Sequence, residues 1–240
     1  MGHFTIDGRE VPFESGQSIM DAAIAAGVYI PHLCHNPEFH PHGSCRLCTV
    51  KQNGRSVAAC VTPAVEGAQV DNETEQIQAD RIALLQMLFV EGNHICPACE
   101  KSGRCQLQAV AYHCGMLAPE LTHFYPQREV DASHSDVVID FNRCILCNLC
   151  VRASRDIDQK DIFSISGRGI DTQLLINSPT GKLADTNFSI EDRAAKVCPV
   201  GAILPKHQGY NVPIGLRLYD QKSVSIVGDV SEHTGDRDGE

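Results

Sequence analysis

The chain has 240 residues and a formal net charge of −10, and it contains no apolar run long enough to span a membrane. General nucleic-acid binding and binding to an anionic membrane surface are excluded, because both require a basic surface. Tryptophan is absent and aromatic residues make up only 5% of the chain, so we expect several small cores rather than one large core.

Cysteine content is high, with twelve cysteines in the chain. The N-terminal stretch MGHFTIDGRE lacks the basic patch and apolar run of a secretion signal, so we expect a cytoplasmic protein. Cysteines in the reducing cytoplasm are more often metal ligands than disulfide partners. Eleven of the twelve fall into three groups, and Cys114 lies outside them.

The first segment, residues 1–76, predicts a small α+β domain. HFTIDGREVPF predicts two short strands around its Asp-Gly turn, and TVKQNGRSVAACVT predicts a hairpin that turns at its Asn-Gly pair. SIMDAAIAAG predicts a short helix between them, with Ser18 and Asp21 forming the N-terminal cap and Gly27 ending it.

The first cysteine group has the spacing C-x10-C-x2-C-x11-C and comprises Cys34, Cys45, Cys48 and Cys60. We expect Cys34 in a loop after the helix and Cys60 on a strand, an arrangement that suits a [2Fe-2S] cluster. A four-cysteine zinc site is the alternative. Gly43 and Ser44 would let backbone N–H groups turn toward the sulfurs. The flanking histidines are expected on the surface, namely His32, His35, His40 and His42.

The second segment, residues 77–135, predicts a helical domain. IQADRIALLQMLFVEG predicts a long helix, and a second helix is expected to start near Gln106 and to run through QAVAYHCG. The apolar face of the long helix is predicted to comprise Ile82, Leu85, Met87, Leu88 and Phe89.

The second ligand group comprises His94, Cys96, Cys99 and Cys105. Three thiolates do not complete a [4Fe-4S] cube, and an imidazole nitrogen is a competent fourth ligand. Gly103 would relax the backbone between Cys99 and Cys105. Cys114 is a competing fourth ligand about two turns along the following helix, and a zinc knuckle is a further alternative. Without a ligand role, Cys114 is a small buried apolar residue.

The third segment, residues 136–206, begins with a predicted strand, VVIDFN, and contains the most specific group: Cys144, Cys147, Cys150 and Cys198. Two-cluster bacterial ferredoxins have the spacing C-x2-C-x2-C-x3-C-P, whose fourth cysteine binds the other cluster. Here Ser154 stands at that position, and the trio expected before Cys198 is replaced by Phe188, Glu191 and Ala194. We therefore predict a ferredoxin-like domain with one [4Fe-4S] cluster. Residues 207–240 are expected to form an extension with an acidic, disordered end.

With the three groups placed, the chain resembles a known family over about residues 2–220. The stretches that carry the resemblance are EGNHICPACEKSGRCQLQAVAY, RCILCNLCVR, IFSISGRG and CPVGAILPK. They are similar to the N-terminal part of the large iron–sulfur subunit of respiratory complex I. They are more similar to the small diaphorase subunit of soluble NAD-reducing [NiFe]-hydrogenases. The resemblance implies a β-grasp ferredoxin fold for the first domain and a cluster-ligand role for His94.

The resemblance also implies an electron-transfer role for one [2Fe-2S] and two [4Fe-4S] clusters. Electrons would pass between a [NiFe]-hydrogenase module and a subunit that binds FMN and NAD (H2 + NAD+ to NADH + H+). The implied partners are this flavin-binding diaphorase subunit and the hydrogenase small and large subunits. The chain has no nucleophile elbow, Walker loop or dinucleotide fingerprint, so we expect no substrate-converting site in it.

Two departures from the complex I pattern favour the hydrogenase relatives. Complex I relatives typically place three residues between the histidine and the next cysteine, whereas only Ile95 stands there in this chain. They also continue into a large molybdopterin-type domain, whereas this chain ends at Glu240. A subunit of complex I or of an NAD-dependent formate dehydrogenase is the alternative within the redox class. A zinc-stabilised scaffold is the alternative from another class.

Overall fold

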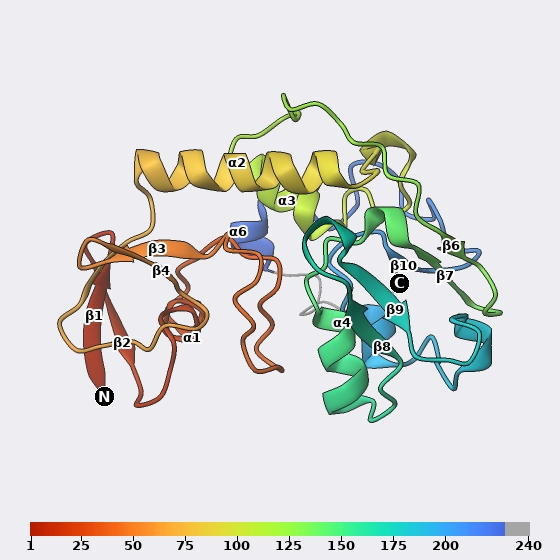
Figure 1. Cartoon of the computed structure of the whole chain (residues 1–240). Helices are drawn as coiled ribbons and strands as arrows, with labels where there is room; N and C mark the ends of the chain where they lie inside the picture. The colour runs from red at the N-terminus through yellow and green to blue at the C-terminus, as the bar shows by residue number, and fades with distance from the viewer. Residues whose placement is uncertain (229–240) are drawn as a thin grey trace.

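The structure is a computed structural model that describes residues 1–228 (Figure 1). Two sheet-bearing units lie at opposite ends of the molecule, and a long helix, α2 (Glu75–Glu91), passes above the space between them. The end that the sequence predicts as a disordered tail, residues 229–240, lies outside the described residues.

The N-terminal unit is a five-stranded mixed sheet with the strand order β2-β1-β5-β3-β4. Strand β1 pairs antiparallel with β2 and parallel with β5, and β3 pairs antiparallel with both β4 and β5. The elements are β1 (Gly2–Ile6), β2 (Arg9–Phe13), α1 (Ile19–Ala25), β3 (Thr49–Gln52), β4 (Arg55–Ala58) and β5 (Gln69–Asp71). Apolar residues of the sheet and of α1 form a core of their own.

The predicted turns and the predicted helix cap of this unit are confirmed. Asp7 and Asn53 both have a φ of 48°, and the glycine that follows each has a φ of 80°, as a two-residue hairpin turn requires. The Ser18 hydroxyl accepts from the N–H of Asp21, and the Asp21 carboxylate accepts from the N–H of Ser18, each at 3.1 Å. Gly27 follows the helix with a φ of 67°.

Helix α2 begins two residues before the predicted start, because the Thr74 hydroxyl accepts a hydrogen bond from the N–H of Ile77. Leu85 and Phe89 are buried as expected. Met87 is 49% exposed, so its assignment to the apolar face is wrong. It lies two residues from both buried positions, which places it on another side of the helix.

Arg81 is a buried cation of α2 that the sequence analysis missed, since its side chain is only 1% exposed. Its guanidinium donates to the carbonyl oxygens of Leu47 (3.2 Å), Thr49 (3.4 Å) and Asn72 (3.0 Å). Leu47 and Thr49 flank Cys48 in the chain. Arg81 therefore attaches the long helix to the loop that carries the cysteines of the first group.

The remainder of the described chain shares one apolar core. A three-stranded sheet has the order β10-β7-β6, a separate hairpin pairs β8 with β9, and all of these pairings are antiparallel. The strands are β6 (Val130–Asp131), β7 (Val137–Asp140), β8 (Phe163–Ser166), β9 (Gln173–Ile176) and β10 (Ile203–Pro205). The α-helices are α3 (Gln106–His113), α4 (Leu149–Arg152), α5 (Arg193–Lys196) and α6 (Val224–Val227).

Apolar packing occupies the region where a two-cluster ferredoxin would hold its second cluster. Phe188 and Ala194 are buried, and the ring of Phe188 packs edge-on against that of Phe163 with centroids 5.5 Å apart. Ser154 is fully buried, and its hydroxyl accepts from the N–H of Ile162 at 2.8 Å. The positions that lack cysteines thus contribute to the core of this unit.

Candidate metal centres

The cysteines of the first group lie as two close pairs. The N–H of Cys45 donates to Sγ of Cys34 at 3.4 Å, and the Sγ atoms of Cys48 and Cys60 are also 3.4 Å apart. Two thiolates on one tetrahedral ion lie ~3.8 Å apart when each metal–sulfur bond is about 2.3 Å. The separation of the Cys48 and Cys60 sulfurs therefore fits two thiolates on one ion, and the neighbouring Cys34 and Cys45 would serve the second ion of a [2Fe-2S] cluster.

Hydrogen bonding within each pair favours thiolate at one member. The bond from Cys45 lowers the pKa of Cys34 to about 5, and the bond from Cys60 lowers the pKa of Cys48 to about 7. The pKa values of Cys45 and Cys60 are raised by the same bonds. Ser44 adds backbone and side-chain hydrogen bonds to Cys34, as expected for a loop that turns its N–H groups toward sulfur.

Two details of the first group differ from the predictions. Cys60 lies in a turn just after β4, not on a strand. His40 and His42 are exposed as expected, but His32 and His35 are each only 4% exposed. The side chain of Gln106 in α3 donates to the carbonyl oxygen of His32 at 3.2 Å, so a helix distant in sequence covers this part of the loop.

The third group is enclosed in a small cavity with apolar walls. Burial raises the pKa of Cys144 to about 11 and raises the pKa values of Cys147 and Cys150 well above the ordinary range. Backbone N–H groups of Leu146, Leu149 and Val151 hydrogen-bond these three sulfurs. The cavity is lined by all four predicted cysteines, Cys144, Cys147, Cys150 and Cys198. The apolar residues in its walls include Ile165, Leu174, Val200, Ala202 and Ile203.

The loop of the third group is held in an unusual backbone conformation. Leu146 and Asn148 have φ values of 54° and 62°, in the left-handed region that a bulky residue such as leucine rarely adopts. This conformation brings the N–H of Leu146 to Cys144. Strained backbone that directs N–H groups at ligand sulfurs is typical of a functional site.

The cysteines of the second group lie in the segment that leads from α2 into α3. Cys96 begins a short 3-10 helix (Cys96–Ala98), Cys99 ends it, and Cys105 caps α3. Burial raises the pKa of Cys105 to about 12, and the nearby Cys99 and Cys96 add to the effect. Gly103 has a φ of 77°, so it provides the backbone freedom expected between Cys99 and Cys105.

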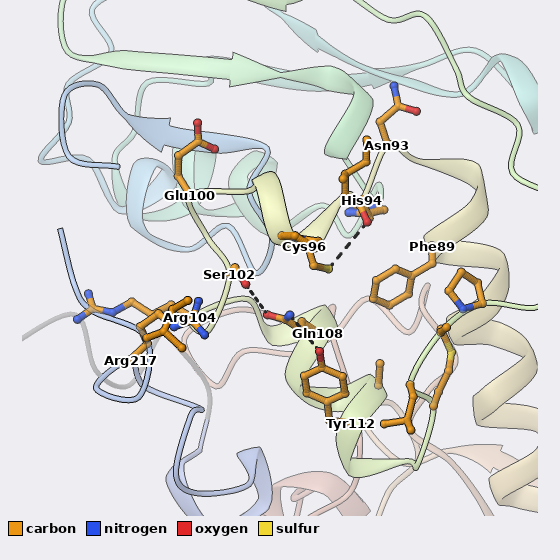
Figure 2. Close-up of a pocket in the computed structure, with 18 of the residues that line it drawn as sticks. Phe89, Asn93, His94, Cys96, Glu100, Ser102, Arg104, Gln108, Tyr112 and Arg217 are labelled. Carbon is orange, nitrogen blue, oxygen red and sulfur yellow. Dashed lines mark hydrogen bonds between the residues drawn. The ribbon is translucent and has the colours of Figure 1, made fainter. Parts of the chain in front are cut away.

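His94 lies beside Cys96 at the edge of a cavity of about 900 Å³ (Figure 2). Its Nε2 atom is buried and has no hydrogen-bond partner in the described chain. Burial, with a contribution from Arg143, lowers the pKa of His94 to about 4. A neutral imidazole with a buried lone pair has the chemistry of a metal ligand.

Gly92 makes room for the His94 ring. A Cβ atom at position 92 would lie 2.6 Å from Nε2 of His94 and 2.9 Å from the carbonyl oxygen of Asn142. The ring of Phe89 packs edge-on against the imidazole of His94, with the ring centroids 5.6 Å apart. The position of His94 is therefore set by a glycine on one side and an aromatic ring on another.

Cys114 caps the C-terminal end of α3 and is buried. Burial raises its pKa to about 11, and its charged neighbours are Arg81 and Glu73 rather than the cysteines of the second group. This environment matches the expectation of a small buried residue.

In residues 1–228, no three His, Cys, Asp or Glu side chains lie close enough together to hold one metal ion.

Two contacts join the second and third groups, and the sequence analysis identified neither. Nη1 of Arg143, the residue before Cys144, lies 3.6 Å from Sγ of Cys99 and ion-pairs with Glu100 at 2.9 Å. A Cβ atom on Gly201 would lie 2.8 Å from the same sulfur. The position of Arg143 beside the third cysteine group was the available signal, because basic residues near thiolates offset their charge.

Three family models match consecutive parts of the chain. A 2Fe-2S iron–sulfur cluster binding domain matches residues 2–75. An NADH-ubiquinone oxidoreductase-G iron–sulfur binding region matches residues 81–119. A 4Fe-4S single cluster domain matches residues 137–204. Mixed α and β structure with iron–sulfur domains of both cluster types is therefore established for this chain.

Among curated proteins, the gamma subunit of the NAD-reducing hydrogenase HoxS from Cupriavidus necator is 41% identical over 221 residues. The match covers 92% of this chain and 94% of that subunit. This chain belongs to the same family. A chain in a crystal structure of an NAD+-reducing [NiFe]-hydrogenase in the H2-reduced state agrees with it, with 52% identity and a TM-score of 0.91. That match covers 93% of this chain and 95% of the other.

Longer relatives match through only one part of their length. The 78 kDa subunit of the NADH-ubiquinone oxidoreductase from Candida albicans is 33% identical, over 84% of this chain and 28% of its own length. The alpha subunit of an NADPH-Fe(3+) oxidoreductase from Geobacter sulfurreducens is 31% identical, over 86% of this chain and 24% of its own length. In the described residues, no helix combines the length and apolar character needed to cross a membrane.

Proposed function

We propose that this chain is the iron–sulfur electron-transfer subunit of an NAD-reducing hydrogenase. The observation that carries the proposal is the arrangement of the three groups, in which the third segment contacts both of the others. The proposed ligands are Cys34, Cys45, Cys48 and Cys60 for a [2Fe-2S] cluster, with His94, Cys96, Cys99 and Cys105 for one [4Fe-4S] cluster. Those for the other [4Fe-4S] cluster are Cys144, Cys147, Cys150 and Cys198.

Such clusters would supply reversible one-electron uptake and release. The chain itself supplies thiolates, one neutral imidazole, backbone N–H donors to sulfur, and apolar walls around the third site. Because the third segment contacts the ligand loops of both other groups through Arg143 and Arg152, we propose that its cluster occupies the middle of the electron path. No acid, base or nucleophile of this chain has a chemical step in the proposal.

The proposed partners follow from the relatives. The solved relative is an NAD+-reducing [NiFe]-hydrogenase, so we propose hydrogenase small and large subunits that carry the nickel–iron site. We also propose a diaphorase subunit that binds FMN and NAD. All twelve cysteines are free thiols, which suits a reducing compartment, and we propose a cytoplasmic location.

The domain division is also a proposal. We assign residues 1–76 to a β-grasp [2Fe-2S] domain, and the mixed sheet with α1 supports this assignment. We assign 77–135 to a helical [4Fe-4S] domain, 136–206 to a single-cluster ferredoxin-like domain, and 207–240 to an extension. Strand β6 pairs with β7 across the second of these boundaries, so we expect the second and third domains to fold together.

Metal analysis of the protein purified without oxygen tests the proposal. We expect about 10 irons per chain, since the three clusters contain about two, four and four. The competing zinc-stabilised scaffold predicts near-stoichiometric zinc with little iron, and that result would overturn the electron-transfer role.

Co-purification distinguishes the alternatives within the redox class. Partner chains that contain nickel and FMN support the hydrogenase assignment. A molybdenum-containing partner would instead indicate a formate dehydrogenase, and a membrane-bound quinone reductase would indicate a complex I-type assembly. The Candida albicans relative favours testing the latter, although this chain corresponds to only 28% of its length.

The histidine ligand has a test of its own. We expect His94→Ala to alter the EPR signal of one [4Fe-4S] cluster and to leave the other cluster signals unchanged, because His94 lies two residues before Cys96 and its buried Nε2 has no hydrogen-bond partner in the described chain. Cys114→Ser is the matched control, because Cys114 is buried beside Arg81 and away from the group. An unchanged spectrum in His94→Ala would remove His94 from the ligand set.

A further inference from the structure

Arg152 is a buried cation at the end of α4, with only 6% of its surface exposed. Its guanidinium donates to four backbone carbonyl oxygens. These belong to Cys34 (2.6 Å), His40 (2.8 Å), Asn148 (3.2 Å) and Cys147 (3.5 Å). These four hydrogen bonds thus go to backbone atoms of two separate loops.

The two loops carry cysteines of different groups. Cys34 belongs to the first group and lies 118 residues from Arg152 in sequence, whereas Cys147 belongs to the third group. Figure 1 shows the long loop after α1 reaching from the N-terminal sheet toward α4. The planar, five-donor fork of arginine spans several acceptors at once, which the single ammonium of lysine does not.

Arg152 forms no ion pair with a carboxylate in residues 1–228, although it is buried. Arg143 and Arg81 differ in this respect, because Arg143 pairs with Asp140 and Glu100 and Arg81 pairs with Glu73. A buried unpaired charge is costly. Arg152 does have the ring of Phe39 5.4 Å from its guanidinium carbon, but a ring offsets only part of a full charge.

The negative groups that act on Arg152 belong mainly to the two cysteine groups. Burial lowers its pKa, and Cys34, Cys147, Asp156 and Cys60 act in the opposite direction. Loaded clusters with their thiolates carry net negative charge, so they would supply the countercharge that the described chain lacks around this guanidinium.

We propose that Arg152 is a positioning residue shared by the [2Fe-2S] site and the third-group [4Fe-4S] site. Its fork holds the two ligand loops together, and its charge stabilises the more negative, reduced state of both clusters. The proposal rests on the cluster assignment given above. It assigns to one residue a simultaneous effect on two midpoint potentials, and none on the potential of the His94 cluster.

The test uses the full chain purified without oxygen together with its bound partners, and midpoint potentials measured by EPR-monitored titration. In Arg152→Gln we expect the potentials of the [2Fe-2S] and third-group clusters both to fall, while that of the His94 cluster stays at the parent value. Arg155→Gln is the matched control, because Arg155 lies three residues on, is exposed and pairs with Asp156. A shift in one cluster only, in none, or equally in all three overturns the proposal.

Arg152→Lys separates charge from geometry and decides the case if Arg152→Gln does not retain both clusters. The ammonium keeps the charge, so we expect potentials near the parent values. It does not reach all four carbonyls, so we expect altered magnetic coupling between the two reduced clusters. Unchanged coupling, or potentials as low as in Arg152→Gln, overturns the proposal. If the parent protein itself lacks the three cluster signals, the cluster assignment is wrong, whatever the variants show.

Discussion

The second and third ligand groups would hold the same type of cluster in different surroundings. The third group lies in an enclosed cavity with apolar walls, and Cys147, Cys150 and Cys198 are buried. The second group adjoins a cavity of about 900 Å³, and Ile95 within it is 62% exposed. Solvent access and ligand charge both tune iron–sulfur potentials, so the two proposed [4Fe-4S] clusters would differ in potential.

The ligand sets differ in charge as well. In the proposed assignment four thiolates would surround the third cluster, whereas neutral His94 would replace one thiolate at the second. The third site compensates with backbone N–H groups at three of its sulfurs. The second site has Arg143, whose guanidinium lies 3.6 Å from Sγ of Cys99. Backbone N–H groups also act at the second site, where that of Gln108 hydrogen-bonds Cys105, so the proposed clusters would differ mainly in the guanidinium that lies against a sulfur of the second group.

Removing a thiolate from the enclosed site should have the largest effect. In Cys147→Ser we expect the loss of about four of about ten irons, because the apolar walls offer no replacement ligand. H2-dependent NAD+ reduction should fall to background, since the middle of the proposed path is missing. Iron analysis and activity of the assembled protein measure both effects. Cys114→Ser should keep its iron and activity, and an active Cys147→Ser protein would contradict the proposed path.

The next variant, Gly201→Ala, changes a residue in the segment of the third group and should affect the second group. Gly201 follows Cys198 closely, but its added Cβ would lie 2.8 Å from Sγ of Cys99 and 3.2 Å from Cβ of Lys101. Overpacking of this kind costs about 1–3 kcal/mol. We therefore expect Gly201→Ala to reduce the occupancy of the second cluster and to spare the third, as EPR and iron analysis would show.

Gly209→Ala is the matched control for this variant. Its Cβ would approach only the flexible side chain of Glu100, at 2.9 Å from Cγ, so we expect full occupancy of both clusters. If Gly201→Ala instead disturbed the third cluster, the close approach of the two groups at this position would not be the cause of its effect.

Ligands that lie close together in the sequence could be predicted to share a site, whereas contacts between distant segments could not. Cys144, Cys147 and Cys150 recur at short, regular spacing, so the sequence alone placed them together. His94 was predicted from the missing fourth ligand and the family resemblance, and the structure adds that its Nε2 is buried without a partner in the described chain. Cys114 lies nine residues after Cys105 in the sequence, and only the fold places it beside Arg81.

The contacts between groups were not predictable from local patterns. Arg152 reaches Cys34 across 118 residues, and Arg143 reaches Cys99 across 44. The burial of His32 likewise depends on Gln106, 74 residues away. Strands β6 and β10 have only two and three residues, which is too short for an alternation pattern to appear. Spacing motifs thus predict ligand sets, whereas the surroundings that tune them come from tertiary packing.

Exchanging the histidine for a thiolate should make the two sites more alike. His94→Cys adds one negative charge to the second site, so we expect the midpoint potential of that cluster to fall. The third cluster should keep its potential, because its ligands are unchanged. EPR-monitored titration measures both values in one sample. A potential that did not change in His94→Cys would mean that Arg143 or solvent dominates the electrostatics of the second site.

The smallest expected effect is a difference in pH dependence of cluster loading. Burial raises the pKa values of Cys144, Cys147 and Cys150, so these thiols keep their protons at neutral pH until iron binds. Loading must release those protons, and a lower pH opposes it. The pKa of His94 is lowered to about 4, so above that pH the imidazole has no proton to release.

The second site should therefore release about one proton fewer than the third, and its loading should depend less steeply on pH between about 5 and 9. Reconstitution of iron-depleted protein at several pH values, with each cluster quantified by its EPR signal, measures the two slopes. His94→Cys is the internal control, because a thiol at position 94 restores the missing proton. Equal slopes in the parent protein would contradict a neutral imidazole ligand. Unequal slopes that become equal in His94→Cys would assign the difference to His94 rather than to the more open cavity around it.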